Sequence, residues 1–369
     1  MQFEVRAYEL EGLLDRMPAG VEILSLDCFD TLIWRGTNAP IDVFADLSLT
    51  GSGMGGRMLA EHAARVRALA TTGAKEIHLR GIYEFLYASV SPDVIDHAVE
   101  HELAQERKHA FAFAPAVALI REAKRRGLKV IIVSDMYWSQ PQLSAHIASA
   151  AGEDLLADID RIFVSSEYGV GKCDGLFKHV LEELKTSPEK ILHVGDNHSA
   201  DYISAARLGI HAVHLRQFER EAEQRLRMEA TAEIMLDPTA RSTRAIGQMH
   251  RAQIALRPPC EPATALGHDV MGPVMHTFAL WLKAELDAAS AALGKPVRPL
   301  FVMRDGYLPF LAFDKMYPDA GAAKVELSRF VAFRASIKDA AALDSYLTEW
   351  AWQLPVYLRA RGSPAGTSD

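Results

Sequence analysis

The stretch from Val21 to Leu32, VEILSLDCFDTL, decides how the N-terminal part of the chain folds. Its first six residues (21–26, VEILSL) are mostly apolar and are followed at once by the acidic residue Asp27. A continuous apolar run of this length is typical of a buried strand in a parallel sheet. The stretch therefore predicts a strand that delivers Asp27 to the sheet edge where α/β proteins bind their ligands.

Four further apolar runs follow along the chain: 128–133 (LKVIIV), 161–164 (RIFV), 191–194 (ILHV) and 210–215 (IHAVHL). Amphipathic helical patterns separate them, at 115–126, 139–150, 173–185 and 199–208. Strands that alternate with helices are joined by right-handed crossovers. The pattern predicts a doubly wound, Rossmann-like α/β domain whose parallel sheet carries helices on both faces.

Composition shifts along the chain predict further domains around this core, which we assign to residues 1–35 and 113–216. Residues 36–112 read as helical at 57–71, 79–89 and 92–110, with no convincing strand, so we expect a helical cap inserted after the first strand. We then expect a helical linker at 217–265 and a smaller α/β domain at 266–360. That domain has strands at 298–303 and 325–333 around a helix at 307–317. The tail, 361–369, has the composition of disordered segments.

Length and charge narrow the class of protein. The chain has 369 residues, 49% of them hydrophobic, and a net charge of −8, which argues against a nucleic-acid-binding face over the whole molecule. Its three cysteines are far apart and show no metal-ligand spacing. Neither a signal peptide nor a transmembrane segment of about 20 apolar residues is evident. We therefore expect a cytoplasmic protein that acts on a small molecule.

Polar residues stand at the carboxyl ends of four of the predicted strands. Asp27 follows the first strand, Ser134 the second, Lys172 precedes a helix after the third, and Asp196 and Asp201 follow the fourth. Taken singly, each is explained as a helix cap or a solvated surface group. Taken together, they supply a carboxylate nucleophile, a hydroxyl donor, a fixed cation and two carboxylates suited to Mg²⁺.

This order of residues resembles the motif set of the haloacid dehalogenase-like (HAD) superfamily. The resemblance implies that Asp27 is the nucleophile, with Ser134 and Lys172 as the other catalytic residues. It also implies that Asp27, the backbone carbonyl of Phe29 and Asp196 ligate Mg²⁺. Asp201 belongs to the same fourth motif. Residues 36–112 would then be the mobile cap.

Further stretches resemble a bacterial subgroup of HAD hydrolases that occurs with glycosyltransferases of surface-polysaccharide synthesis. These stretches include GIYEFL (81–86) in the cap, GHDVMGP (267–273) and FVMRDGYL (301–308). The resemblance implies a glycosyltransferase as a partner and a sugar phosphate as a substrate.

One departure leaves the reaction open. HAD phosphatases place a second Asp two residues after the nucleophile as general acid and base, and here that residue is Phe29. The next acid is Asp30, which we expect to order the turn through a hydrogen bond of its side chain. We predict a Mg²⁺-dependent phosphohydrolase that forms an aspartyl phosphate. The alternatives are a low-turnover phosphate-binding or scaffold protein and a metal-independent dehalogenase.

A second site is a weaker hypothesis. Arg304 and Asp305 lie between a predicted strand and helix, where Ser328 and Arg329 could join them around an anion. The simpler explanation is a strand-to-helix turn in which Asp305 caps the helix and Gly306 relieves the backbone.

Overall fold

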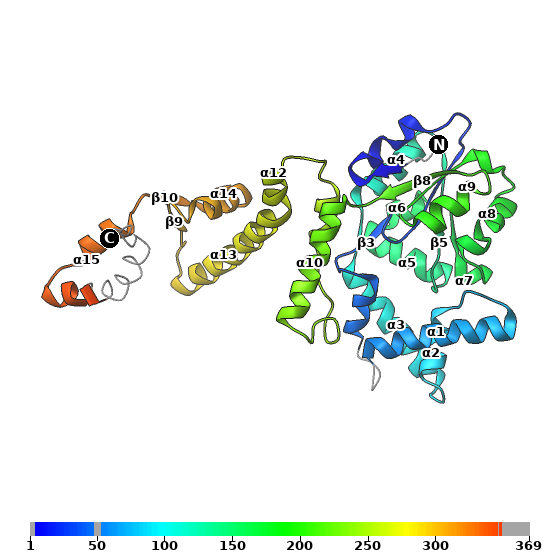
Figure 1. Ribbon diagram of the computed structural model, residues 1–369, viewed down its shortest axis with the longest axis horizontal. Coiled ribbons are helices and arrows are strands. Elements are labelled where there is room, and N and C mark those ends of the chain that lie inside the picture. Colours follow the sequence, from blue (N-terminus) through cyan, green and yellow to red (C-terminus); the bar gives the residue numbers. More distant parts are fainter. Residues whose placement is uncertain (1–3, 48–52, 346, 349–369) are drawn as a thin grey trace, which may run out of the picture. The chain divides into compact units, whose positions relative to one another are not determined.

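The computed structural model describes residues 4–47, 53–345 and 347–348 (Figure 1). The chain divides into two compact units, Met1–Cys260 and Glu261–Asp369. No helix in the described part of the chain has both the length and the apolar character needed to cross a membrane.

The first unit contains a six-stranded parallel sheet in the order β1-β8-β7-β2-β5-β6. The five predicted strands are present, and the doubly wound α/β class is confirmed. The strand that the sequence did not predict is β1, whose three residues EVR include two charges and give no apolar run. The strands are β1 (Glu4–Arg6), β2 (Ile23–Leu26), β5 (Lys129–Ser134), β6 (Arg161–Val164), β7 (Ile191–Gly195) and β8 (His211–Arg216).

Helices cover both faces of this sheet because successive side chains of a buried strand point to opposite sides. On β2, Leu24 and Leu26 join the core that includes Leu119 of α4, whereas Ile23 joins the core that includes Phe177 of α8. The first face carries η1 (Ala7–Arg16), α4 (Ala114–Arg125) and α5 (Gln140–Ala151), and the second carries α8 (Leu176–Leu184) and α9 (Ser204–Ala206). Short helices α6 (Glu153–Ala157), α7 (Ser165–Tyr168), η3 (Lys172–Asp174) and η4 (Pro188–Lys190) lie in the connections.

Between β2 and α4 the chain leaves the core and forms the insert. Its helices are η2 (Pro40–Asp46), α1 (Gly53–Thr72), α2 (Leu79–Leu86) and α3 (Pro92–His109), grouped together beside the core in Figure 1. Two short antiparallel strands, β3 (Ile33–Arg35) and β4 (Ala110–Ala112), frame it. The expectation of no strand within 36–112 is therefore wrong at β4. Three residues are too few to display the alternation of a strand, and β4 depends on its pairing with β3.

The insert also contacts the core at a point remote from β3 and β4. The backbone N–H groups of Lys75 and Glu76 donate to the carbonyl of Gly169 at 2.9 and 3.2 Å, and the N–H of Leu79 donates to the carbonyl of Tyr137 at 2.6 Å. The insert is thus held over the loops that follow β5 and β6.

Residues 217–260 differ from the expected linker. They form α10 (Arg220–Leu236) and α11 (Arg251–Ala255) and belong to the first unit. The N–H of Gln248 donates to the carbonyl of Gly36 at 2.7 Å, and Arg251 Nη1 donates to the carbonyl of Thr37 at 2.8 Å. The segment is therefore tied to the chain just beyond β3. Its charged composition indicated a surface helix but gave no sign of this backbone pairing.

The second unit has a small core of Ala279, Phe301, Phe310 and Phe313. It contains α12 (Pro262–Leu266), η6 (Gly267–Met271), α13 (Gly272–Leu293), β9 (Leu300–Val302), α14 (Tyr307–Met316), η7 (Pro318–Ala320), β10 (Ala323–Val325) and α15 (Arg329–Ser336). Strands β9 and β10 pair in parallel.

The strand expected at 325–333 is wrong beyond Val325, because α15 begins at Arg329. The Ser328 hydroxyl accepts a hydrogen bond from the N–H of Val331 at 3.1 Å and caps that helix. The predicted tail, 361–369, lies outside the described residues.

Candidate active site

The loop after β2 presents Asp27 at the carboxyl edge of the sheet. The N–H of Asp27 still bonds to the carbonyl of Val194 at 2.9 Å, so the strand pairing continues up to the carboxylate. The chain then turns sharply at Asp30, whose φ of 56° is left-handed and whose N–H bonds to the carbonyl of Ile33 at 2.8 Å. Aspartate tolerates this conformation better than most residues. The loop is therefore held by backbone contacts on both sides of the nucleophile candidate.

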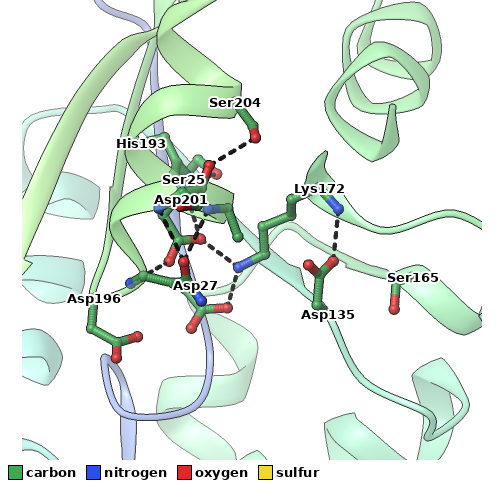
Figure 2. Close-up of polar contacts among 12 residues, drawn as sticks. Ser25, Asp27, Asp135, Ser165, Lys172, His193, Asp196, Asp201 and Ser204 are labelled. Atoms are coloured by element: carbon green, nitrogen blue, oxygen red, sulfur yellow. Dashed lines mark hydrogen bonds and ion pairs between the residues drawn. The ribbon is translucent and has the colours of Figure 1, made fainter. Parts of the chain in front are cut away.

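Lys172 joins two of the predicted carboxylates, as Figure 2 shows. Its Nζ lies 2.5 Å from Asp27 Oδ1 and 2.5 Å from Asp201 Oδ1. Its own backbone N–H donates to Asp135 Oδ1 at 2.9 Å, which fixes the start of η3. The ammonium is buried, so this charge is held in place between strand ends that are far apart in the sequence.

Asp201 is oriented by several contacts from its own loop and from β7. It lies in a π-helical turn, His198–Ile203, and its Oδ2 accepts the N–H of Asn197 at 2.9 Å. Gly195 gives it room, since a Cβ there would lie 2.2 Å from Asp201 Cγ. Residue 195 is therefore a glycine for a steric reason, because no larger residue fits beside Asp201.

The buried side chain of His193 contacts Asp201. His193 Nε2 lies 3.2 Å from Asp201 Oδ1, and His193 Nδ1 lies 2.8 Å from Ser25 Oγ. Burial lowers the pKa of His193, although Asp201 acts to raise it, and the lowered pKa favours the neutral ring. Because a carboxylate only accepts, we assign the ring proton to Nε2, and Nδ1 then accepts a hydrogen bond from the Ser25 hydroxyl.

Electrostatics divide the three carboxylates into two kinds. Burial acts to raise the pKa of Asp201, but Lys172 and His193 outweigh it and lower that pKa well below its usual range. By contrast, burial and the neighbouring carboxylates raise the pKa of Asp27 to about 7, despite Lys172, and the pKa of Asp196 to about 8. Asp201 is thus a permanent anion, whereas Asp27 and Asp196 lack enough positive charge around them.

This imbalance fits a metal ion. Asp27, Asp196 and Asp201 each offer one oxygen, and these atoms lie within 4.8 Å of one another. Within the described part of the chain, no donor bonds to the Asp196 carboxylate, which lies apart from Lys172 in Figure 2. Hard oxygen ligands with uncompensated negative charge suit Mg²⁺.

The site opens into a cavity of about 370 Å³ between the core and the insert. Ser134 and Phe29 line it from the core, and Phe44 and Glu106 line it from the insert. Arg35, on β3, pairs with Glu106 at 2.8 Å, so both of these charges are balanced. The cavity is sized for a small substrate.

Phe29 lies two residues after Asp27, where HAD phosphatases have an aspartate as general acid and base, and it has no acidic or basic group. The Phe29 ring packs edge-on to Trp138 at 5.4 Å, and the Arg35 guanidinium lies 4.4 Å from its centre. Asp30 lines the cavity, but the expected side-chain hydrogen bond is absent: Oδ1 has no hydrogen-bond partner among the described residues, and Arg251 Nη2 is 3.8 Å away. The backbone N–H of Asp30, rather than its carboxylate, orders the turn.

The second predicted site lies in the second unit, where Arg304, Asp305 and Ser328 line the same cavity. Arg304 and Asp305 follow β9 at the rim of a cavity in the second unit, and both side chains are 84% exposed. They contact each other at 3.4 Å. The side chain of Arg329 lies outside the described residues, and the Ser328 hydroxyl is occupied in capping α15.

Sequence reasoning found the residues at the strand ends but missed those that hold them. Ser25 and His193 face each other across β2 and β7, and Asp135 supports Lys172. Strand alternation was the available signal for His193, because it stands two residues before Gly195 on the same strand face. Its pairing with Ser25 depends on the register between strands, which a single sequence does not reveal.

Comparisons with known proteins show the family of the chain. Residues 23–209 match the family model of the haloacid dehalogenase-like hydrolases, which covers half of the chain. The chain therefore belongs to the haloacid dehalogenase-like hydrolase family, as the motif resemblance implied. A search among curated proteins finds no match.

Solved structures of several HAD proteins are similar to the chain at low identity. L-2-haloacid dehalogenase from Xanthobacter autotrophicus is 16% identical, with a TM-score of 0.40 over 59% of this chain and 83% of that one. A HAD phosphatase from Thermococcus onnurineus is 15% identical, with a TM-score of 0.38 over 53% of this chain and 87% of that one. Dehalogenases and phosphatases both occur among these structures, so they do not distinguish the two reactions.

Proposed function

We propose that this HAD hydrolase is a Mg²⁺-dependent phosphohydrolase that acts on a small phosphorylated metabolite through an aspartyl phosphate on Asp27. The observation that carries the proposal is the carboxylate group Asp27, Asp196 and Asp201, whose oxygens lie within 4.8 Å of one another. A dehalogenase that works without a metal has no use for the uncompensated charge of Asp196. A sugar phosphate of surface-polysaccharide synthesis would be one such substrate.

The proposed roles follow from the contacts. Lys172 binds Asp27 through Oδ1, and the second oxygen accepts no hydrogen bond from the described residues and is available to attack phosphorus. The ester oxygen of the substrate then leaves with its bonding electrons, and water hydrolyses the aspartyl phosphate. Ser134, buried at the end of β5 and lining the cavity, would donate a hydrogen bond from its hydroxyl to a phosphoryl oxygen.

The metal would be held by Asp27, Asp196 and the carbonyl of Phe29, with Asp201 beside them. When bound, Mg²⁺ would offset the negative charge of the transferring phosphoryl group. Lys172 contributes a second positive charge that is already in place, so little reorganisation is needed in the transition state. His193 and Ser25 act through Asp201 and are positioning residues.

Two other functions can be distinguished from the proposed phosphohydrolase by the reaction that each would or would not catalyse. A metal-independent dehalogenase is favoured by the aromatic Phe29, since that branch also lacks the second aspartate. A phosphate-binding scaffold for a glycosyltransferase is favoured by the same residue, because the departing oxygen receives no proton from position 29. A dehalogenase would retain activity in a chelator, and a scaffold would bind phosphate without releasing product.

The test is phosphate release from p-nitrophenyl phosphate by the full chain with Mg²⁺ and with EDTA. We expect turnover with Mg²⁺, its loss in EDTA, and a loss of more than about 10²-fold in Asp196→Ala, with weaker Mg²⁺ binding by calorimetry. Asp154→Ala, at an exposed carboxylate of α6, is the matched control and should behave as wild type. Wild-type activity of Asp196→Ala in EDTA would rule out the phosphohydrolase.

A further inference from the structure

The cavity above Asp27 is strongly acidic. Seven carboxylates and two cationic side chains line it. Most of these carboxylates form an ion pair with a cationic side chain. Lys172 pairs with Asp27 and Asp201, and Arg35 pairs with Glu106. Glu61 pairs with Arg57 and Arg65. Asp30 lies 3.8 Å from Arg251. After Asp196, which the proposed metal would neutralise, one cavity carboxylate forms no ion pair within the described part of the chain, although the Lys172 charge acts on it from farther away.

That carboxylate is Asp135, directly after Ser134 at the end of β5. Its Oδ1 accepts the backbone N–H of Lys172 at 2.9 Å, which fixes the direction of the side chain. No side chain in the described part of the chain forms an ion pair or hydrogen bond with it, and it is exposed to the solvent of the cavity. In Figure 2 its carboxylate lies next to the backbone nitrogen of Lys172, apart from Asp27 and Asp196.

We propose that Asp135 determines specificity by binding a protonated amine on the leaving group, so that the substrates are phosphomonoesters of amino alcohols or amino sugars. The inference rests on the proposed phosphohydrolase function and names the substrate class for the same site. Asp135 does not take part in the chemical step.

The physical reason is a difference in interaction between classes of leaving group. An ammonium gains a charge-assisted hydrogen bond to Asp135, whereas a carboxylate on the leaving group is repelled by the same oxygen. A neutral hydroxyl gains a weaker hydrogen bond. The limited volume, about 370 Å³, keeps a bound leaving group near this wall of the cavity.

The experiment compares three esters of nearly equal size with the full chain and Mg²⁺: 2-aminoethyl phosphate, 2-hydroxyethyl phosphate and carboxymethyl phosphate. We expect kcat/KM for the amine to exceed that for the hydroxyl compound by about 10-fold or more, with the carboxylate lowest. Glucosamine 6-phosphate and glucose 6-phosphate form a second pair, which tells whether the amine belongs on a sugar or on a short alkyl chain.

Asp135→Asn keeps the acceptor for the Lys172 N–H but removes the charge. It should abolish the preference for the amine over the hydroxyl compound and raise kcat/KM for the carboxylate relative to the hydroxyl compound. Asp135→Glu retains the charge and should therefore keep part of the preference for the amine. It tests the role of the charge if Asp135→Asn is poorly folded. Asp154→Asn removes an exposed charge elsewhere and should change none of these ratios.

The outcomes separate the two proposals. If p-nitrophenyl phosphate is hydrolysed but both matched series show no amine preference, or a preference that survives in folded Asp135→Asn, the role of Asp135 is wrong and the phosphohydrolase stands. If none of the esters is hydrolysed with Mg²⁺, the phosphohydrolase is wrong and the inference about Asp135 is overturned with it.

Discussion

Two strand-end loops of this protein look alike in sequence and differ in what the fold does with them. The loop after β2 carries Asp27 and turns at Asp30 with φ 56°, and the loop after β9 carries Arg304 with φ 109°. Around Asp27, neighbouring strands β5 and β7 supply Ser134 and Asp196, and the segment after β6 supplies Lys172, so polar groups converge there. Asp27, Ser134 and Lys172 are buried. Around Arg304, a two-stranded sheet leaves Arg304 and Asp305 84% exposed. A polar strand end becomes a candidate site when neighbouring strands bring partners to it.

A substitution at Gly195 should disrupt the arrangement of polar side chains around Asp27. In Gly195→Ala the new Cβ would lie 2.2 Å from Asp201 Cγ, which must displace the carboxylate that holds Lys172. We expect phosphate release to fall by more than about 10²-fold, because small displacements of catalytic groups cost that much. The melting temperature should fall as well. Steady-state kinetics and thermal denaturation measure the two effects.

Gly55→Ala is the matched control for that variant. Gly55 lies in α1, and nothing lies within 4 Å of a Cβ added there. It should leave activity unchanged. Equal activity of Gly195→Ala and Gly55→Ala would mean that the position of Asp201 does not matter for turnover.

The effect of the missing general acid and base can be measured with Phe29→Asp. A carboxylate at residue 29 can take a proton from the water that attacks the aspartyl phosphate, which is typically worth ~10²–10⁴-fold. Because the Arg35 guanidinium lies over this position, at 4.4 Å from the Phe29 ring, we expect the lower end of that range, about 10²-fold faster phosphoenzyme decay. Rapid-quench kinetics would measure it, with Phe29→Asn as the isosteric control that lacks a base.

Asp30 is the competing explanation for this step. If folded Phe29→Asp decays at the wild-type rate and Asp30→Asn abolishes decay, Asp30 is the base and we have assigned the roles wrongly. Asp30 lines the cavity, and its Oδ1 accepts no hydrogen bond from the described residues, so this carboxylate is placed to bind a water molecule.

The loop after β9 should respond to substitution only through stability. Arg304→Gly relieves a left-handed backbone conformation that costs on the order of 1 kcal/mol in a residue with a side chain. We expect a small rise in the stability of the second unit and no change in phosphate release. Arg304→Ala keeps the strain and should not stabilise. A large loss of activity in either variant would show that this loop takes part in the function.

How far the sequence could predict the structure depended on the length of each pattern. Apolar runs of four to six residues, such as those ending at Leu26 and Val194, gave the sheet and the residues after it. The three-residue strands β1, β3 and β4 were missed because they depend on pairing with distant strands. The same limit hid His193 and the role of residues 246–251, whose partners are about 170 to 215 positions away in the chain.

The most direct test of the central claim is to trap the covalent intermediate. The full chain would be mixed with a phosphomonoester and Mg²⁺, quenched in acid within milliseconds, digested and analysed by mass spectrometry. We predict one phosphoryl group on the peptide that contains Asp27, absent in EDTA and absent in folded Asp27→Asn. Equal labelling of Asp27→Asn, or release of phosphate by the wild type with no labelled Asp27 at any quench time, would contradict the aspartyl-phosphate mechanism.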